Sequence, residues 1–362
     1  MLHINKFKFG LKEKNNRKEL IKKISYDINY SPLNFPFDKK SKKETKILAT
    51  IGPKSCSSNS INRISKFTNL FRINGSHNSI EWHVKISKKI KEICPDSFIL
   101  LDIPGLKPRT NNTNDIYIKK NQMVKFFYGR ECDEQGILSV ETTKPLPKIN
   151  DKVKEFSVSD GLFKFQYVKN KNNYIQGISK TTFKLKTKKG LNIPYSFYDD
   201  DLQEKLYLEF INKAEKVQYD GIGLSFIQNG VILKKIRNIL KNKILVSKIE
   251  NLYGLNKAAE ISKNSDLIMI DRGDLLAEVG TGNLYKSICE ISKQAHCFKK
   301  PLIMATENLE SMQKRLQPSK SEIIALEHSI NLGSHIIMLS DETATSPLFM
   351  NTLEWLYTFL QE

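Results

Sequence analysis

Hydrophobic residues gather in short runs that alternate with stretches of helical spacing. Eight runs are rich in Ile, Leu and Val, as is typical of strands buried on both faces of a parallel sheet; they span 46–51, 70–74, 98–103, 221–227, 244–249, 266–271, 301–306 and 335–340. Helical spacing marks 80–93, 202–216, 231–240, 255–261, 284–295, 321–332 and 347–360. This alternation predicts an α/β protein with a (β/α)8 TIM barrel, whose functional side chains lie at the carboxyl ends of the strands.

The interval 110–189 interrupts the alternation. It contains short segments of alternating hydrophobicity, separated by Asn, Asp, Gly and Lys, at 116–118, 123–127, 163–168 and 182–185. They predict a small antiparallel β domain inserted after the third strand. An insert at the catalytic rim of a barrel is expected to act as a lid. The predicted domains are a basic N-terminal arm at 1–44, a barrel at 45–109 and 190–362, and the lid at 110–189.

Composition is that of a globular protein, with 40% hydrophobic and 27% charged residues. No apolar run reaches the roughly 18 residues of a membrane span, and residues 1–30 lack a signal-peptide core. A cytoplasmic location without membrane contact is therefore expected. The cysteines lack C-x-x-C spacing and are interpreted as reduced thiols; they are Cys56, Cys94, Cys132, Cys289 and Cys297.

The formal net charge of +19 raises the question of nucleic-acid binding. Lysine is spread along the whole chain, however, and aromatic residues do not interleave with basic runs as stacking platforms would require. Compositional bias is therefore the preferred interpretation, and nucleic acid is not an expected partner. For the basic arm, an accessory contact and a solvated lead-in both remain open.

Charged residues close the fifth and sixth predicted strands. Lys248 and Glu250 end one, and Arg272 and Asp274 follow the next. Charged residues at a single strand end usually just meet solvent, but two adjacent strands deliver these groups to one rim. Carboxylates are hard ligands for Mg²⁺, and a cation suits phosphate oxygens. Because no Ser-His-Asp or Cys-His arrangement competes, phosphoryl transfer is the predicted chemistry.

Other polar residues also lie at predicted strand ends, and each has a structural interpretation beside the functional one. Arg72 could pair with Asp102, Thr306 could cap a helix, and His77 could be a surface residue. Their convergence on one rim favours function. The remaining members are Asn74, Arg109, Ser225, Ser340 and Glu342.

Several motifs together resemble pyruvate kinases, from about residue 45 onward. They lie at 45–53, 72–77, 189–194, 247–251, 272–275, 305–312 and 338–344. The resemblance implies transfer of the phosphoryl group of phosphoenolpyruvate to ADP. It implies Mg²⁺, or Mn²⁺, held by Glu250 and Asp274, and a Lys248 that neutralises the transferring phosphoryl group and the enolate oxygen.

The resemblance also implies how the substrates are held. Arg72 grips the phosphate, the Gly273 backbone and Thr306 receive the carboxylate, and protonation passes through water near Thr306 and Ser340. Arg109 bridges phosphates when the lid closes. The residues implied to face ADP or ATP are Pro53, Asn74, His77 and Lys189.

The chain departs from the family pattern at several positions. Lys107 stands where potassium-dependent members carry Glu, so its ammonium is expected to replace K⁺. The family usually has Gln, Met and Gly where this chain has Glu307, Asn308 and Asp341, and the lid motif reads Ser-Asp-Gly at 159–161. The chain ends after the last predicted barrel helix. Oligomers are therefore expected to form without the family's usual C-terminal domain.

These departures keep three functions open. The first is the pyruvate kinase reaction itself. The second keeps the fold and the metal and phosphate chemistry but acts on a different enol phosphate or carboxylic acid. Glu307, Asn308 and Asp341 motivate it, because the barrel geometry puts them beside the carboxylate pocket, where the two added acids oppose an anionic substrate. The third is a non-catalytic binding or regulatory protein.

Overall fold

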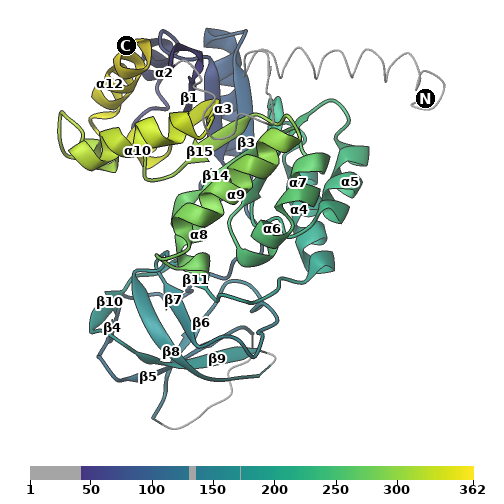
Figure 1. The fold of residues 1–362 in the computed structure, drawn as a ribbon, viewed down its shortest axis with the longest axis vertical. Helices are drawn as coiled ribbons and strands as arrows, with labels where there is room; N and C mark the ends of the chain where they lie inside the picture. Colours follow the sequence, from purple (N-terminus) through teal and green to yellow (C-terminus); the bar gives the residue numbers. More distant parts are fainter. Residues whose placement is uncertain (1–41, 130–135, 172) are drawn as a thin grey trace.

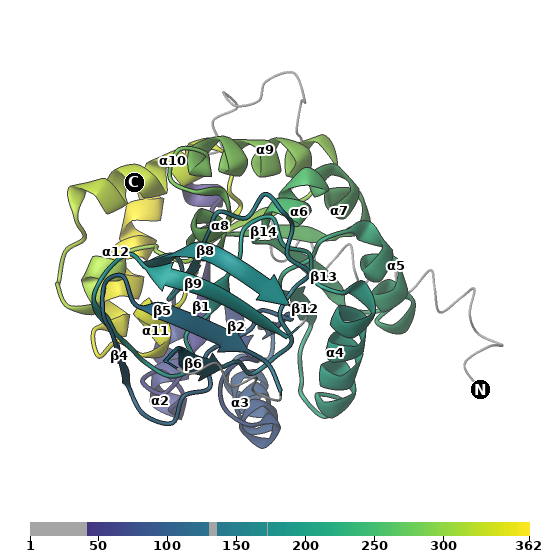
Figure 2. The same ribbon diagram turned by 90° about the horizontal axis from the view of Figure 1, so that it is seen from below.

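The computed structural model describes residues 42–129, 136–171 and 173–362, and it confirms the predicted barrel. Within these residues, eight parallel strands close in the order β1-β16-β15-β14-β13-β12-β3-β2, with helices around them (Figures 1 and 2). The strands are β1 (Lys46–Ile51), β2 (Leu70–Asn74), β3 (Phe98–Ile103), β12 (Gly221–Leu224), β13 (Ile244–Ile249), β14 (Leu267–Asp271), β15 (Leu302–Ala305) and β16 (Ile336–Leu339).

Three barrel strands end earlier than the hydrophobic runs predict, and one of them, the eighth, ends at Leu339 instead of residue 340. The fourth run ends at Leu224 instead of residue 227, and the seventh ends at Ala305 instead of residue 306. In both places the backbone becomes left-handed, with φ of 62° at Phe226 and 59° at Thr306. A positive φ is incompatible with a strand, so apolar character alone overestimates the strand length.

The helices follow the predicted spacing with two kinds of difference. The predicted helix at 255–261 is two short helices that meet at Lys257, and three helices were not predicted: α2, α8 and α11. The described helices are α2 (Ser58–Ile64), α3 (Ile80–Ile93), α4 (Asp200–Lys213), α5 (Gly230–Ile239), α6 (Leu252–Asn256), α7 (Ala258–Asn264), α8 (Arg272–Val279), α9 (Leu284–Cys297), α10 (Lys320–Asn331), α11 (Asp341–Ala344) and α12 (Phe349–Gln361), with 3-10 turns η2 (Lys42–Glu44) and η3 (Glu310–Gln313). None of them combines the length and apolarity that crossing a membrane requires.

A capping box anchors the segment that follows β15. Ser319 accepts a hydrogen bond from the Glu322 amide at 3.3 Å, and the Glu322 carboxylate accepts one from the Ser319 amide at 2.7 Å. The same carboxylate accepts a bond from the Ser311 amide in η3 at 2.7 Å. The start of α10 therefore also fixes the turn next to the strand end that carries Thr306.

A second unit of β structure lies at one end of the barrel, below it in Figure 1. It consists of a six-stranded sheet, β11-β7-β8-β9-β5-β6, and the pair β10-β4. Phe126, Phe156 and Phe165 form its aromatic core. The strands are β4 (Ile116–Ile118), β5 (Met123–Phe127), β6 (Leu138–Glu141), β7 (Glu155–Val158), β8 (Phe163–Lys171), β9 (Tyr174–Ser179), β10 (Phe183–Leu185) and β11 (Leu191–Asn192).

This insert differs from the expected antiparallel arrangement in one pair, because β5 and β6 run parallel. The limits given for the arm, the barrel and the lid remain predictions. Of the predicted arm at 1–44, residues 1–41 lie outside the described residues, and the structure describes only 42–44.

Candidate active site

The period of two along each strand explains why polar residues converge at one end of the barrel. The barrel interior is filled by apolar side chains such as Leu100, Val246 and Met269. The next residue on the same face of each strand is polar, so Asp102 and Lys248 extend the interior rows of Leu100 and Val246. Asp271 and Arg72 extend their rows in the same way, as the next inward positions of β14 and β2. The apolar interior therefore ends in a polar layer at the carboxyl ends of the strands.

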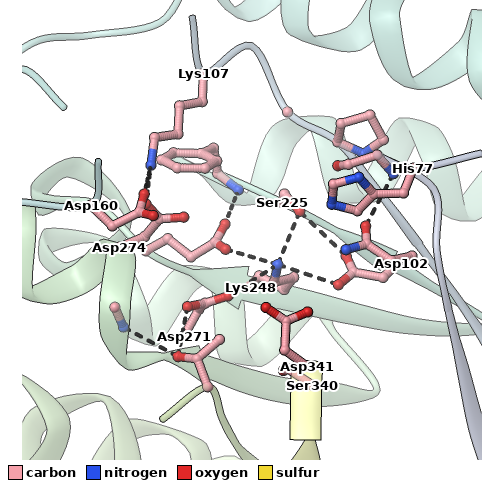
Figure 3. A pocket seen from close by; sticks show the side chains of 18 of the residues that line it. His77, Asp102, Lys107, Asp160, Ser225, Lys248, Asp271, Asp274, Ser340 and Asp341 are labelled. Carbon is pink, nitrogen blue, oxygen red and sulfur yellow. Dashed lines mark hydrogen bonds and ion pairs between the residues drawn. The ribbon is translucent and has the colours of Figure 1, made fainter. Parts of the chain in front are cut away.

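A cavity of about 370 Å³ opens over this layer (Figure 3). Among the described residues its lining holds nine acidic side chains against five Lys or Arg, although the whole chain carries a formal charge of +19. The acidic members are Asp102, Asp160, Glu250, Asp271, Asp274, Glu307, Glu310, Asp341 and Glu342, and the basic members are Arg72, Lys107, Arg109, Lys144 and Lys248.

Lys248 lies at the centre of the polar layer. Its Nζ is 2.9 Å from Glu250 Oε1, 3.3 Å from Asp102 Oδ2 and 3.4 Å from Asp271 Oδ2. It also donates to Ser225 Oγ at 3.2 Å. Burial by itself would lower the pKa of Lys248, but these carboxylates outweigh burial and raise the pKa above its ordinary value. The ammonium is therefore a permanent positive charge on the cavity floor.

Arg72 is held in place by its neighbours on the adjoining strands. Its Nε and Nη2 donate to Asp102 Oδ2 at 2.9 and 2.8 Å, and its Nη1 donates to Thr50 Oγ1 at 3.1 Å. Asp102 is buried, yet Lys248 and Arg72 hold its pKa below the ordinary value. The sequence interpretation that Arg72 pairs with Asp102 is confirmed, and the guanidinium still lines the cavity.

Three carboxylates meet beside Lys248. One oxygen each of Glu250, Asp271 and Asp274 lies within 4.8 Å of the others. Glu250 Oε2 accepts from the Phe226 amide at 2.6 Å, whereas Oε1 receives no hydrogen bond of good geometry despite the nearby Lys248. Burial raises the pKa of Glu250 to about 8. A buried, under-satisfied oxygen among carboxylates suits a hard divalent cation such as Mg²⁺ or Mn²⁺.

Lys107 is buried against the same cluster. Its Nζ is hydrogen-bonded to Asp274 Oδ1, and it donates to Asp160 Oδ1 at 2.8 Å. Gly190 makes room for this side chain, because a Cβ at that position would lie 2.4 Å from Lys107 Cε. Asn192 also donates to Asp274 Oδ1, at 3.4 Å. The Lys107 ammonium, the tethered cation expected from the sequence, is therefore hydrogen-bonded to Asp274, a predicted metal ligand.

Thr306 joins the ends of β14 and β15. Its Oγ1 lies 2.9 Å from Asp271 Oδ1 and 2.8 Å from its neighbour's carbonyl oxygen, and it accepts from the Gly273 amide at 3.2 Å. The hydroxyl has one proton, and the charged carboxylate is the stronger acceptor. Arg272, in turn, donates to the Thr306 carbonyl oxygen. Thr306 and Gly273, which the resemblance assigns to the substrate carboxylate, thus lie together.

The rim carries most of the other predicted site residues. Asn74, His77, Arg109 and Ser340 line the cavity. Burial, followed by the charge of Arg109, lowers the pKa of His77. The cavity lining does not include Pro53 or Lys189: Pro53 is exposed, and the Lys189 amide is bonded to Thr110 Oγ1 at 3.0 Å.

The three departures near β15 and β16 differ in their surroundings. Glu307 and Asp341 are exposed and line the cavity. Asn308 is buried outside the lining; it donates to the carbonyl oxygens of Met304 at 3.1 Å and Met338 at 3.0 Å. It also accepts from Arg272 at 2.7 Å. The expectation that Asn308 borders the substrate pocket is therefore wrong, because its amide ties β15 to β16.

Sequence reasoning missed Asp271, Asp160 and Lys144 as cavity residues. In the sequence, Asp271 is the last residue of a predicted strand, and a carboxylate that ends a buried strand is a usable signal. Asp160 and Lys144 come from the insert, and only the fold brings them to the barrel rim. Burial lowers the pKa of Lys144 to about 8.

Comparison with known proteins agrees with the barrel and its rim. Residues 42–352 match the family described as pyruvate kinase, barrel domain. A pyruvate kinase of Hypocrea jecorina is 30% identical over 325 residues, with 83% of this chain and 59% of that protein covered. One from Thermococcus litoralis is 29% identical, covering 86% and 68%, and pyruvate kinase 1 of Saccharomyces cerevisiae is 29% identical, covering 83% and 64%. The chain thus spans about 59–68% of the length of these relatives. It belongs to the pyruvate kinase family.

Proposed function

We propose that this protein transfers the phosphoryl group of phosphoenolpyruvate to ADP, giving pyruvate and ATP, with Mg²⁺ or Mn²⁺. The observation that carries the proposal is the buried Lys248 ammonium beside the carboxylate cluster of Glu250, Asp271 and Asp274. Phosphoryl transfer needs positive charge and a metal held in fixed positions, and it needs no covalent nucleophile.

The metal ligands in this proposal are Glu250 and Asp274. A divalent cation bound there supplies charge that offsets the phosphoryl and enolate oxygens. Lys248 neutralises the same oxygens from the cavity floor, where its three carboxylate neighbours keep it protonated. Arg72 binds the phosphate with the N–H groups that Asp102 and Thr50 leave free.

The substrate carboxylate is assigned to the Gly273 amide and the Thr306 hydroxyl. To bind it, the amide would leave Thr306 Oγ1 and the hydroxyl would leave Asp271 Oδ1, their partners in the structure. Protonation of the enolate carbon is assigned to water between Thr306 and Ser340, both of which line the cavity. Asn74 and His77 are proposed to face the nucleotide, with Pro53 and Lys189 farther out. Arg109, beside the insert, is proposed to bridge phosphates.

The proposal includes activity without K⁺, because the Lys107 ammonium is buried beside Asp274. It also includes action in the cytoplasm and, where oligomers form, subunit contacts through the barrel or the insert. These assignments extend the family's chemistry to a chain that spans 59% of the Hypocrea jecorina relative.

A second function has its own support. The excess of acidic over basic side chains in the cavity disfavours a small trianionic substrate, and Glu307 and Asp341 both contribute to it. The alternative is the same metal and phosphate chemistry on a different enol phosphate or carboxylic acid, one that carries less negative charge.

A coupled assay separates the two functions. Pyruvate release from phosphoenolpyruvate is measured with ADP and Mg²⁺, beside a panel of other enol phosphates and acids. The Glu250→Ala variant is expected to be inactive on the true substrate, and Glu354→Ala, an exposed change on α12, serves as the matched control. Robust turnover of another acid with none on phosphoenolpyruvate would replace the first function by the second.

A further inference from the structure

We infer that Asp271 is a third carboxylate ligand of the divalent cation. Its negative charge offsets the ammonium of Lys107, which forms an ion pair with the proposed metal ligand Asp274. This inference rests on the metal position in the proposed function. That function assigns only Glu250 and Asp274 to the metal, and Asp271 adds a ligand on the side of Thr306.

The geometry of the three carboxylates follows one pattern: each has one oxygen fixed by the protein. Glu250 Oε2 accepts from the Phe226 amide at 2.6 Å, and Asp271 Oδ1 accepts from Thr306 Oγ1 at 2.9 Å. Asp274 Oδ1 accepts from Lys107. Hydrogen bonds to one oxygen orient the other, as partners of metal ligands commonly do. Each carboxylate is thereby left with a second oxygen for a cation.

An independent feature of the cluster is a buried oxygen that receives no hydrogen bond. Glu250 Oε1 is a buried atom that receives no hydrogen bond, although Lys248 Nζ is 2.9 Å away. Glu250 is only 1% exposed, and it lines the cavity. A carboxylate oxygen has two lone pairs, so beside Lys248 this oxygen can still bind a metal cation.

Charge balance explains why a third carboxylate is needed. Lys107 contacts Asp274, and Lys248 contacts Glu250, so an ammonium group accompanies each of the two assigned ligands. Both ammonium groups repel an incoming divalent cation and offset the charge of the ligands. Asp271 adds a third carboxylate to the cluster, so three carboxylates face two ammonium groups, and its Oδ2 shares Lys248 with Glu250 at 3.4 Å.

The test is Mn²⁺ binding to the substrate-free protein, measured from the electron paramagnetic resonance signal of free Mn²⁺. Asp271→Asn is expected to weaken binding by about tenfold or more, as loss of a ligand or its orienting partner does. Asp341→Asn removes a charge from the same cavity outside the cluster and is expected to change affinity far less. Lys107→Met is expected to bind Mn²⁺ more tightly.

Several outcomes would overturn the inference. Equal affinity in Asp271→Asn and the parent protein removes Asp271 as a ligand, and equal losses in Asp271→Asn and Asp341→Asn reduce it to a general charge effect. Unchanged Mn²⁺ affinity in Lys107→Met would show that Lys107 does not weaken metal binding and that Asp271 has nothing to compensate for. Glu250→Gln tests the metal position itself, separately from the role of Asp271. If this variant binds Mn²⁺ normally, the metal position in the proposed function fails as well.

Folding is checked by thermal unfolding without metal. Should Asp271→Asn not fold, Thr306→Val gives the second readout, because it removes the donor that orients Asp271 and keeps the carboxylate. Weaker Mn²⁺ binding in this variant supports the inference, and unchanged binding contradicts it.

Discussion

Arg72 and Asp102 are joined by two hydrogen bonds, of 2.9 and 2.8 Å, that end on the same carboxylate oxygen. Both residues are buried, with 6% and 2% exposure. The same oxygen is 3.3 Å from Lys248 Nζ, so one carboxylate positions both proposed phosphate-binding cations. The proposed phosphate-binding groups are therefore held in place by strands β2, β3 and β13 in the protein without ligand.

This arrangement predicts a large loss of stability in Asp102→Ala. The change leaves Arg72 and Lys248 short of countercharge in a buried place, and breaking a buried pair in this way costs about 3–5 kcal/mol. Asp102→Asn keeps an acceptor and is expected to lose less. Urea unfolding measures both variants, and equal, small losses would mean that solvent reaches the pair.

Catalysis is predicted to depend on Glu250 and Asp274. Replacing either by Ala removes a proposed metal ligand and is expected to cost about 3 kcal/mol or more of transition-state stabilisation, a loss of at least ~100-fold in kcat/KM. The measurement is the Mg²⁺ dependence of turnover. Full activity in Glu250→Ala would exclude this metal site.

The positions around β15 and β16 are predicted to separate into two effects. Glu307→Gln with Asp341→Gly removes two acidic groups from the cavity lining, so it is expected to lower KM for phosphoenolpyruvate. Asn308→Met is expected to destabilise the fold by about 1–3 kcal/mol, because the carbonyl oxygens of Met304 and Met338 lose their donor. Steady-state kinetics and urea unfolding distinguish the effects. An unchanged KM in the double variant would remove the main support for an altered substrate.

Turnover is predicted without K⁺. Lys107 provides a tethered cation, whereas Lys107→Glu places a carboxylate beside Asp274 and Asp160 and is expected to lower the rate and make it respond to K⁺. Rates are compared in tetramethylammonium buffer with and without K⁺. Strong K⁺ stimulation of the unmodified protein would show that Lys107 does not replace the ion.

Replacing Glu342 by Gln is predicted to stabilise the protein more at high pH than at low pH. Burial raises the pKa of Glu342 from its ordinary 4.5 to about 7, so the folded state binds the proton more tightly than the unfolded state. Stability conferred by the protonated group is complete below pH 4.5 and is lost as the pH rises to 7. Glu342→Gln avoids this loss, which is at most about 3 kcal/mol.

The Tm of Glu342→Gln is therefore expected to exceed that of the parent protein by more at pH 8 than at pH 5. The Gln oxygen can still accept the 2.7 Å hydrogen bond from the Ser340 amide. A Tm difference that is the same at both pH values would show that Glu342 ionises freely in the folded protein.

The barrel could be predicted because its strands are buried on both faces and therefore read as continuous apolar runs. The insert could be predicted only in outline: β6 has mixed burial and only four residues, and β11 has two, so neither produces a clear pattern. Helices α8 and α11 begin in polar residues that belong to the site, and this hides their helical spacing.

The candidate site was predictable where a residue ends a strand, as Lys248 and Glu250 do. Contacts that depend on how the insert and the loops fold back onto the barrel were not predictable. The contact of Lys107 with Asp274 requires the insert to return at Gly190, and the burial of Asn308 requires a left-handed turn at Thr306 and Glu307, with φ of 59° and 52°.

The most direct test of the central claim is ³¹P NMR of phosphoenolpyruvate, ADP and Mg²⁺ with the purified protein, because it observes substrate and product phosphorus together. We predict that the phosphoenolpyruvate signal disappears as the γ-phosphate signal of ATP appears in equal amount, and that Lys248→Met abolishes both changes. An unchanged phosphoenolpyruvate signal with folded, Mg²⁺-saturated protein would contradict the claim.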